Sequence, residues 1–551
     1  MSRDLKTSVL TVVLLLSTQT VSVPLSGAGR STQGSGEPKL IVVLVADQMR
    51  ADYLERYSGK FTGGLRRLME NGAWFERAMY PYLNTITCAG HSTIGTGTFP
   101  YQHGMILNTW FDRKTGKTTE CTDDAKQKEI NYNGLTGPGD SGRRIKTPSL
   151  ADSVRRQRGH VVTMSLKARS AIGLAGHAGD IVLWFDTRGG WQTSTAFTKK
   201  PTPFVQEYIA NNRVESAYGH AWERLYDASA YQGTDDDAVE RAPTGWTRTF
   251  PHVIGSKSGK TDEEFYGHWM RSPLSDEYLG RLAAATADTL RLGRGPQIDF
   301  LGVSFSALDL VGHAYGPDSH EVQDVVARLD VTIGALLDHL DRTVGAGNYV
   351  VGFSADHGVA QIPEETKRGG RETNAETAAA IEKALVPLLG PGKYVANAAY
   401  TDIYLQKAAL KRMKKDPAVR TALLDALRGM TGIAAAYTAD EIMAPGARSS
   451  SDPLKRAAAL NYYPGRSGDV IIVPRENWIL STSATTHGTL YPYDQHVPVI
   501  FYGAGVKKGR FAVDASPADI APTLGALAGI SFRTTDGHER KEAFAAPVST
   551  R

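Results

Sequence analysis

The chain has 551 residues, of which 41% are hydrophobic, and a formal net charge of +4. A chain of this size and composition can bury a large core, which excludes an intrinsically disordered protein. So small a basic excess gives no support to nucleic acid or to an acidic membrane surface as a partner.

The first 28 residues are predicted to be a cleaved signal peptide. Arg3 and Lys6 supply positive charge before a short apolar run over residues 8–16, and residues 26–28 form an acceptable small-residue cleavage site. The run is too short to cross a bilayer comfortably, so a retained N-terminal anchor is the less favoured alternative. We therefore expect a periplasmic or secreted protein without stable membrane insertion.

If the protein is exported, the two cysteines of the chain could form a disulfide. An oxidising compartment would allow Cys88 and Cys121 to form a disulfide. The alternative is two separate buried thiols, and the sequence does not decide between them.

Residues 29–38 are polar and rich in glycine and serine, which predicts a flexible leader. Apolar runs typical of buried central strands follow at residues 39–46, 161–166, 298–305, 349–354 and 497–502. Helical patterns lie between them, the clearest from Val322 to Leu340 with a period of about 3.6 residues, and a shorter helix is expected at residues 518–527. This alternation predicts an α/β fold over residues 39–545, with a doubly wound, mixed but mainly parallel sheet flanked by helices.

Two stretches interrupt the alternation of strands and helices. Residues 185–290 are rich in tryptophan, tyrosine, glycine and charge, and five of the eight tryptophans fall between Trp184 and Trp269, more than a surface loop needs. The stretch predicts an insertion that caps the functional site. Residues 363–480 predict a second insertion, with helices around residues 405–430. For both stretches the alternative is an elaboration of the scaffold that makes no contact with a substrate.

Six side chains that can bind metals stand at or just beyond the ends of apolar, strand-like runs, although long segments of chain separate them. They are Asp47, Asp309, His313, Asp356, His357 and His487. An open α/β sheet places its ligand site at this edge. Three carboxylates and three imidazoles suit a pair of zinc ions better than calcium, which prefers oxygen ligands alone. The sequence therefore predicts a two-metal hydrolase.

Each of these ligands by itself has an ordinary explanation, such as a helix cap, an ion pair or a buried histidine. Their common position at strand ends favours the metal centre. Gly312 and Gly316 are expected to break the helix near Asp309 and His313. Five other histidines are assigned a structural or supporting role: His91, His103, His160, His177 and His496.

Thr87 is the candidate nucleophile. A two-metal site about 4 Å wide stabilises the entering and leaving oxygens of an in-line displacement, so phosphate and sulfate esters are the natural substrates. The attacking group could be a bound water or a hydroxyl. Thr87 precedes a glycine-bearing helix start, where backbone N–H groups could face an anion, and a metal would lower the pKa of its hydroxyl. The alternatives are that Thr87 only caps the helix, or that Thr85 is the nucleophile.

Lys167 and Arg169 follow the predicted strand at residues 161–166. Residues i and i+2 face the same side while the chain stays extended, so both cations could point at the metal edge. There they would hold phosphoryl oxygens, arginine with two parallel hydrogen bonds. A solvated pair at a strand end is the alternative.

Taken together, these residues resemble the alkaline phosphatase superfamily, and within it the phosphate-irrepressible, monoester-specific type of the bacterial cell envelope. The resemblance covers nearly the whole chain after the leader and implies an alkaline-phosphatase-like catalytic domain. Its motifs are Asp47-Gln48, Thr87-Cys88-Ala89-Gly90-His91, Lys167-x-Arg169, Asp309-x-x-x-His313, Asp356-His357-Gly358 and Thr486-His487-Gly488.

The resemblance implies two zinc ions and a role for each motif. One zinc would be held by Asp309, His313 and His487, and the other, which also binds the nucleophile Thr87, by Asp47, Asp356 and His357. Asn108, Lys167 and Arg169 would contact the phosphoryl oxygens. No magnesium requirement is expected, and members of this subgroup tend to be monomers.

The implied activity is that of an alkaline phosphatase, acting on a broad range of small phosphate monoesters through a covalent phosphothreonine. A diester would place its second substituent against the cationic clamp, so we favour monoesters. A two-zinc phosphodiesterase or nucleotide pyrophosphatase of the same superfamily is the alternative, and a metal-binding envelope protein with a decayed site is the non-enzymatic one. The residues after Cys88 do not form the sequence that a sulfatase requires. Residues 90–95 nearly match the nucleophile motif of an α/β serine hydrolase, but the final glycine of the motif comes one residue late.

Overall fold

The computed structural model describes residues 37–134, 136–532, 534 and 536–545. The predicted signal peptide and residues 29–36 of the predicted leader lie outside the described residues. Within the described ranges, no helix combines the length and the apolar composition that a membrane span requires.

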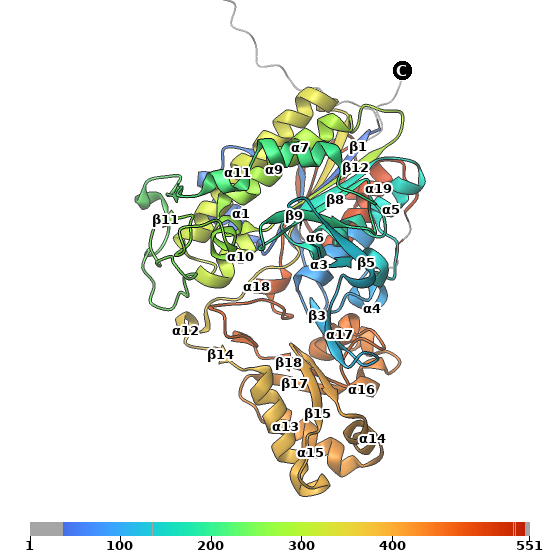
Figure 1. The fold of residues 1–551 in the computed structure, drawn as a ribbon. Helices are drawn as coiled ribbons and strands as arrows, with labels where there is room; N and C mark the ends of the chain where they lie inside the picture. The colour runs from blue at the N-terminus through green and yellow to red at the C-terminus, as the bar shows by residue number, and fades with distance from the viewer. Residues whose placement is uncertain (1–36, 135, 533, 535, 546–551) are drawn as a thin grey trace, which may run out of the picture. The chain divides into compact units, whose positions relative to one another are not determined.

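A mixed sheet of eleven strands forms the main body of the protein (Figure 1). In spatial order its strands are β21 (Gly509–Ala515), β2 (Ala73–Ala78), β20 (Val499–Gly503), β13 (Tyr349–Ser354), β1 (Leu40–Ala46), β12 (Asp299–Phe305), β7 (Val161–Ser165), β8 (Ile181–Asp186), β9 (Gly190–Ser194), β5 (Asp123–Asn131) and β6 (Pro138–Asp140). The strands from β13 to β8 run parallel, whereas β20 and β9 are antiparallel to their neighbours in that block. The predicted mixed, mainly parallel sheet flanked by helices is confirmed.

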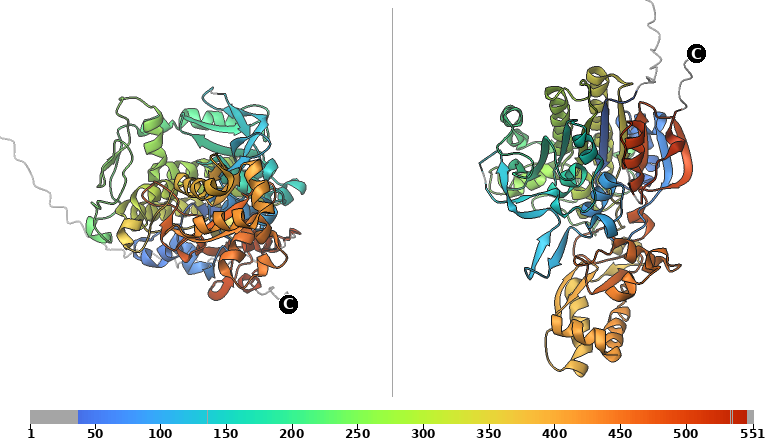
Figure 2. Two further views of the ribbon diagram at one scale, coloured as in Figure 1. Left: turned by 90° about the horizontal axis from the view of Figure 1, so that it is seen from below. Right: turned by 90° about the vertical axis from the view of Figure 1, so that its right-hand side faces the viewer.

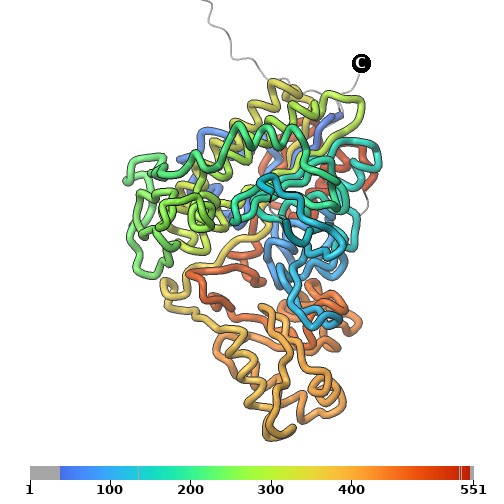
Figure 3. Tube along the Cα trace, viewed as in Figure 1, coloured from blue at the N-terminus to red at the C-terminus, as the bar shows by residue number. Residues whose placement is uncertain are grey.

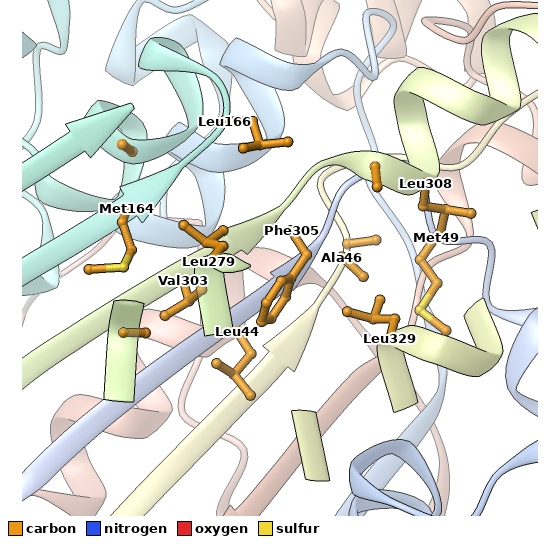
Figure 4. Close-up of a cluster of buried hydrophobic side chains, with 14 of the residues drawn as sticks. Leu44, Ala46, Met49, Met164, Leu166, Leu279, Val303, Phe305, Leu308 and Leu329 are labelled. Carbon is orange, nitrogen blue, oxygen red and sulfur yellow. The ribbon is translucent and has the colours of Figure 1, made fainter. Parts of the chain in front are cut away.

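Two apolar layers cover the faces of this sheet, because successive side chains of a strand point to opposite sides. Leu44 of β1 packs with α9 (Pro273–Thr289) and α11 (His320–Leu340), and Figure 4 shows it beside Val303 and Leu279. Val43 packs in the other layer, with α5 (Leu150–Arg156) and α19 (Ile520–Leu527). The right-hand view of Figure 2 shows the layers on opposite sides of the sheet. Because both faces are covered, every residue of β1 is buried, and its sequence is continuously apolar.

A second sheet of four strands lies within residues 363–480 and is drawn in orange in Figure 1. Its strands, in spatial order, are β15 (Val395–Ala399), β16 (Asp402–Leu405), β18 (Val470–Pro474) and β17 (Ile433–Thr438). Helices α13 (Asn374–Leu389) and α15 (Pro417–Arg428) share an apolar cluster with it. The chain enters and leaves this stretch side by side, where β14 (Gly370–Arg371) pairs with β19 (Trp478–Ile479) (Figure 3). We interpret the stretch as an insertion with a core of its own.

The tryptophan-rich stretch at residues 185–290 is only partly separate from the main sheet. At its two ends, β9 belongs to the sheet and α9 to the helices that cover it, so residues 195–272 are the part that lies outside. Trp191 and Trp269 both pack against Tyr278 of α9. Their ring centroids lie 5.6 and 5.8 Å, respectively, from the centroid of the Tyr278 ring. The predicted bounds of the cap were therefore too wide, because part of the aromatic content serves the core under α9 rather than a lid.

Candidate active site

Three neighbouring parallel strands end at the same edge of the sheet and carry five of the six predicted metal ligands. The strands are β1 (followed by Asp47), β12 (followed by helix α10, Ala307–Tyr315, with Asp309 and His313) and β13 (followed by Asp356 and His357). Carboxyl ends of adjacent parallel strands meet at one edge, which brings segments far apart in sequence together. His487 reaches this edge from the loop after β19.

The six side chains form two groups, each centred on one atom. In the first group, His357 Nε2 lies 3.5 Å from Asp47 Oδ1 and 3.2 Å from Asp356 Oδ2. In the second, Asp309 Oδ1 lies 3.3 Å from His313 Nε2 and 3.5 Å from His487 Nε2. The ligand atoms of Asp309, His357 and His487 also lie within 4.8 Å of one another, so His357 stands between the two groups. The division of the six side chains into two ligand sets stays a prediction.

All three histidines of the centre turn Nδ1 toward a backbone carbonyl oxygen. The pairs are His313 with Thr485 at 3.0 Å, His357 with Gly358 at 3.0 Å and His487 with Thr85 at 2.9 Å. A carbonyl oxygen only accepts hydrogen bonds, so Nδ1 carries the proton and Nε2 of the neutral ring keeps a free lone pair. Two carboxylate oxygens, Asp47 Oδ1 and Asp356 Oδ2, are buried and accept no hydrogen bond. Nitrogen and oxygen lone pairs left without partners in a buried centre fit metal ions of the zinc type.

Negative charge is concentrated in this centre. Burial, followed by repulsion from Asp356, raises the pKa of Asp47 to about 7. Burial lowers the pKa of His357, but attraction to Asp356 outweighs it and raises that pKa to about 9. Divalent cations would replace these protons, so metal binding is expected to release protons and to weaken in acid.

Among the described residues, His91 is a further histidine that reaches the centre. Its Nδ1 lies 2.9 Å from the Thr87 carbonyl oxygen and 3.2 Å from Asp356 Oδ2, and its Nε2 lies 2.7 Å from Ser304 Oγ. Its ring is close enough to Asp47 and Asp356 to share an ion with them. Both of its nitrogens already have partners, however, so we assign His91 to holding the Thr87 backbone in place beside Asp356.

The Lys167 ammonium joins the two ligand groups. Its Nζ lies 2.6 Å from Asp47 Oδ2 and 2.5 Å from Asp309 Oδ2, one carboxylate from each group. Burial lowers the pKa of Lys167, but Asp309 and Asp47 together raise it above its usual value. The ammonium is therefore charged and offsets part of the carboxylate charge.

The structure corrects the local argument for Lys167 and Arg169. Strand β7 ends at Ser165, Lys167 caps helix α6 (Ala168–Ala175), and Arg169 lies in the first turn of that helix. The two side chains thus do not share a face of an extended segment. Arg169 still lies near enough for its charge to act on Lys167, and its Nε is buried without a hydrogen-bond partner. An anion at the centre would supply that partner.

Thr87 is the first residue of helix α3 (Thr87–Thr96), as the glycine-bearing start predicts. Its Oγ1 lies 3.5 Å from His357 Nε2. Gly90 permits this position, because a Cβ there would lie 2.1 Å from the Asp356 carbonyl oxygen, so no larger residue could bring α3 onto that segment. The Thr85 hydroxyl instead donates to the Thr489 carbonyl oxygen at 2.8 Å, which makes Thr85 a structural residue.

Asn108 accepts backbone hydrogen bonds from helix α3 and from Cys121. Its Oδ1 accepts a hydrogen bond from the Cys88 N–H at 2.9 Å, and its backbone oxygen accepts one from the Cys121 N–H at 2.8 Å. A disulfide joins Cys88 to Cys121. The Asn108 NH2 group is thereby left free to donate to a ligand beside Thr87.

Removing this disulfide is expected to lower the free energy of unfolding by about 2–4 kcal/mol, the usual range for a loop of this kind. The double variant Cys88→Ala/Cys121→Ala should unfold at lower urea concentration. It should also show a lower kcat/KM, because the covalent link between the two segments whose backbone N–H groups hold Asn108 is gone. Reductant should reproduce the unfolding shift in the parent chain, which has no other cysteine. If neither the double substitution nor the reductant shifts the unfolding midpoint, the disulfide contributes no stability.

Gln48 is a residue of the centre that sequence reasoning did not assign a role. Its backbone is left-handed (φ 70°), its N–H donates to Asp356 Oδ1 at 3.1 Å, and its Nε2 donates to Asp309 Oδ1 at 2.8 Å. Gly312 serves this contact, because a Cβ there would lie 1.9 Å from Gln48 Oε1. The expectation that Gly312 breaks the helix was wrong, since α10 runs through it and ends at Gly316. The sequence feature that could have pointed to Gln48 was its position directly after the predicted ligand Asp47.

Several known proteins are similar to this chain in sequence and in fold. A profile of the type I phosphodiesterase / nucleotide pyrophosphatase family matches residues 41–497. The chain is 31% identical to the alkaline phosphatase PhoV of Synechococcus elongatus, with 90% of each chain covered, and 31% identical to the alkaline phosphatase PafA of Elizabethkingia meningoseptica, with 91% of this chain and 94% of the relative covered. The crystal structure of PafA superposes with a TM-score of 0.84 at 30% identity, covering 93% of this chain and 99% of PafA. Murine ectonucleotide pyrophosphatase / phosphodiesterase 5 shares the fold at 14% identity, with a TM-score of 0.52, 92% of this chain and 100% of the other being covered.

Proposed function

Because the chain belongs to the type I phosphodiesterase / nucleotide pyrophosphatase family, within the alkaline phosphatase superfamily, we propose that it is an alkaline phosphatase that hydrolyses phosphate monoesters at a two-zinc centre. Two relatives that align over about nine tenths of the chain are alkaline phosphatases, which supports this activity. The observation that carries the proposal is the meeting of one buried threonine hydroxyl, two ligand groups and a set of phosphoryl-binding side chains at one sheet edge.

Each residue of the centre has a chemical task in this reaction. Zinc, when bound by the two groups, would lower the pKa of the Thr87 hydroxyl and offset charge on the leaving oxygen. The Thr87 hydroxyl gives its proton to solvent, its Oγ1 bonds to phosphorus in line with the ester oxygen, and the bond from phosphorus to the alcohol breaks. A phosphothreonine forms, and the alcohol leaves with a proton from water. A second water then attacks the same phosphorus from the side that the alcohol left, the bond from phosphorus to Thr87 Oγ1 breaks, and Thr87 takes a proton from solvent. Asn108, Lys167 and Arg169 bind the non-bridging oxygens, over which charge is spread in the transition state.

Monoesters are favoured over diesters by the number of oxygens that the clamp can bind. A monoester dianion offers all of its non-bridging oxygens to Asn108, Lys167 and Arg169. A diester would place an organic group against one of these polar side chains and leave it without a partner, which is costly in a buried site. Diester hydrolysis is nevertheless the activity for which the matching family is named, so it is the alternative to be tested.

Several further properties are part of the proposal. Two zinc ions are expected rather than one, because two carboxylate–imidazole groups are present, and no magnesium requirement is expected. The predicted signal peptide supports a periplasmic or secreted enzyme. Small phosphate monoesters are the expected partners, with no nucleic acid, and the protein is expected to be a monomer.

The experiment is metal analysis of the purified protein coupled to a screen of monoesters and diesters. We expect about two zinc ions per chain, loss of activity on chelation, recovery with zinc alone, and faster turnover of monoesters. Faster turnover of diesters would support the phosphodiesterase alternative. Full activity in protein free of transition metals would overturn the two-metal mechanism, and zinc-loaded protein without esterase activity would support a decayed site.

Truncating Arg169 should affect the two ester classes differently. In Arg169→Met the transition state for monoesters is expected to lose about 2–4 kcal/mol of stabilisation, the scale for a group directed at developing charge. Diesters should lose less, because their second organic substituent already displaces part of the clamp. The measurement is kcat/KM for a matched pair of aryl mono- and diesters, with the exposed Arg66→Met as control. Equal losses for both classes would contradict the clamp.

A further inference from the structure

A cavity of about 600 Å³ opens beside the metal-binding edge. One wall comes from helix α10, one from the loop before His487, and the third from residues 241–244 together with helix α8 (Glu263–Met270) and its C-cap. They include His313, Leu310, His268, Arg271, Arg241 and Ser483. Two of the three walls therefore belong to segments that carry predicted metal ligands, and the third belongs to the tryptophan-rich stretch. A ligand in this cavity would lie against His313.

The cavity lies on the side of the centre where an ester's alcohol would depart. In-line displacement places the leaving group opposite the nucleophile, each next to one metal of the pair. Thr87 lies beside His357, in the ligand group that contains Asp47 and Asp356. The cavity wall contains His313, of the other group, and contains neither Thr87 nor His357. The space is thus suited to the leaving alcohol.

Arg271 is the cation of this wall that lacks an acidic partner among the described residues. It caps the C-terminal end of α8, and its Nη1 donates to the Gly267 carbonyl oxygen at 3.0 Å. Burial lowers the pKa of the guanidinium, and Asp309 of the metal centre is the nearest acid whose charge acts against that shift. Arg271 is half-buried, and its remaining guanidinium donors can bind an anion with two parallel hydrogen bonds.

The other basic groups that the wall contributes, Arg241 and His268, are already engaged. Arg241 donates to the Thr482 carbonyl oxygen and lies 3.8 Å from a Glu364 oxygen. Both ring nitrogens of His268 face backbone carbonyl oxygens at 2.7 Å. The two acids of the wall lie in the first turn of α8, roughly 10 Å along the helix from Arg271 at 1.5 Å per residue. The end of the cavity at Arg271 is therefore electropositive.

We propose that this cavity holds the leaving alcohol of the substrate and that Arg271 binds a second anionic group on that alcohol. The preferred substrates are then monoesters whose alcohol also carries a carboxylate or a second phosphate. The inference rests on the proposed phosphatase activity and specifies its substrate class. Arg271 is a specificity-determining residue: it touches the substrate at a distance from phosphorus and leaves the chemistry of the phosphoryl group unchanged.

The test compares two-carbon esters that differ only in the end group of the alcohol: phosphoglycolate, ethanediol bisphosphate, ethyl phosphate and phosphoethanolamine. In Arg271→Met, kcat/KM for the first two should fall about tenfold to hundredfold, the scale of a hydrogen-bonded charge pair, with ethyl phosphate changed less than about threefold. Phosphoethanolamine should not fall. Comparing each ester between parent and variant cancels the differing reactivity of the alcohols. A loss for phosphoglycolate alone or for the bisphosphate alone would assign the site to one anion class.

Two controls separate the possible failures. Arg271→Lys keeps the charge and should retain part of the preference, and Arg248→Met, which removes an exposed arginine of the same stretch, should change nothing. Binding of phosphoglycolate and of ethyl phosphate to zinc-loaded Thr87→Ala, measured by calorimetry, should show the same Arg271 dependence without turnover. If no monoester is hydrolysed, the proposed phosphatase function fails. If ethyl phosphate is hydrolysed and Arg271→Met affects all four esters equally, only this inference is overturned.

Discussion

Replacing Thr87 with alanine is expected to abolish the phosphoenzyme and to lower kcat roughly 10³-fold or more, the scale seen when a nucleophile is removed. The Thr87 hydroxyl lies 3.5 Å from His357 Nε2, and the fallback hydroxyl, on Thr85, is held by the Thr489 carbonyl oxygen. The Thr85 hydroxyl is therefore not placed to take over the attack. Rapid quenching with labelled substrate and intact-protein mass spectrometry would measure the adduct.

The same variant should keep two metal ions, because six other side chains form the two ligand groups. Thr87→Ser, which retains the hydroxyl, is the matched control and should still form the adduct. An adduct that persists in Thr87→Ala would locate the nucleophile elsewhere. If the variant loses metal instead, the main role of Thr87 is to hold the centre together, and the covalent mechanism loses its support.

The main sheet could be predicted from sequence because its central strands are covered on both faces. A strand such as β1 then needs no polar residue, and residues 39–46 read as one apolar run. The metal ligands could be predicted for a related reason. Asp47 and Asp356 follow such runs directly, and the ends of adjacent parallel strands must meet.

What could not be predicted depends on contacts between segments far apart in sequence. Gly312 reads as a helix breaker, but its role is to leave space for the Gln48 amide, which belongs to another strand end. Nothing in the sequence near Gln48 reveals its left-handed backbone, which is uncommon outside glycine and asparagine. Arg169 reads as the continuation of a strand because the start of α6 lacks a capping side chain that would mark it.

Lys167→Met is expected to destabilise the metal-free protein by about 3–5 kcal/mol, the usual result of removing one partner from a buried charge pair. The Lys167 side chain is 6% exposed, and its Nζ contacts both Asp47 and Asp309. Without the ammonium, these carboxylates and Asp356 would face one another with less compensating charge. The zinc-loaded variant should lose much less stability, because the metal ions compensate the same carboxylates. Urea unfolding of both forms measures the difference.

The activity of this variant tests the second task of Lys167. Loss of one phosphoryl contact should lower kcat/KM for monoesters by about 2–4 kcal/mol, which corresponds to roughly 30- to 1,000-fold. Lys167→Arg keeps the positive charge, so it should preserve most of the metal-free stability while placing the charge differently toward phosphate. Unchanged stability of metal-free Lys167→Met would mean that protons, and not the ammonium, neutralise Asp47 and Asp309. A stability loss without an activity loss would separate the two tasks, because Lys167 would then serve the empty centre and have no contact with the substrate.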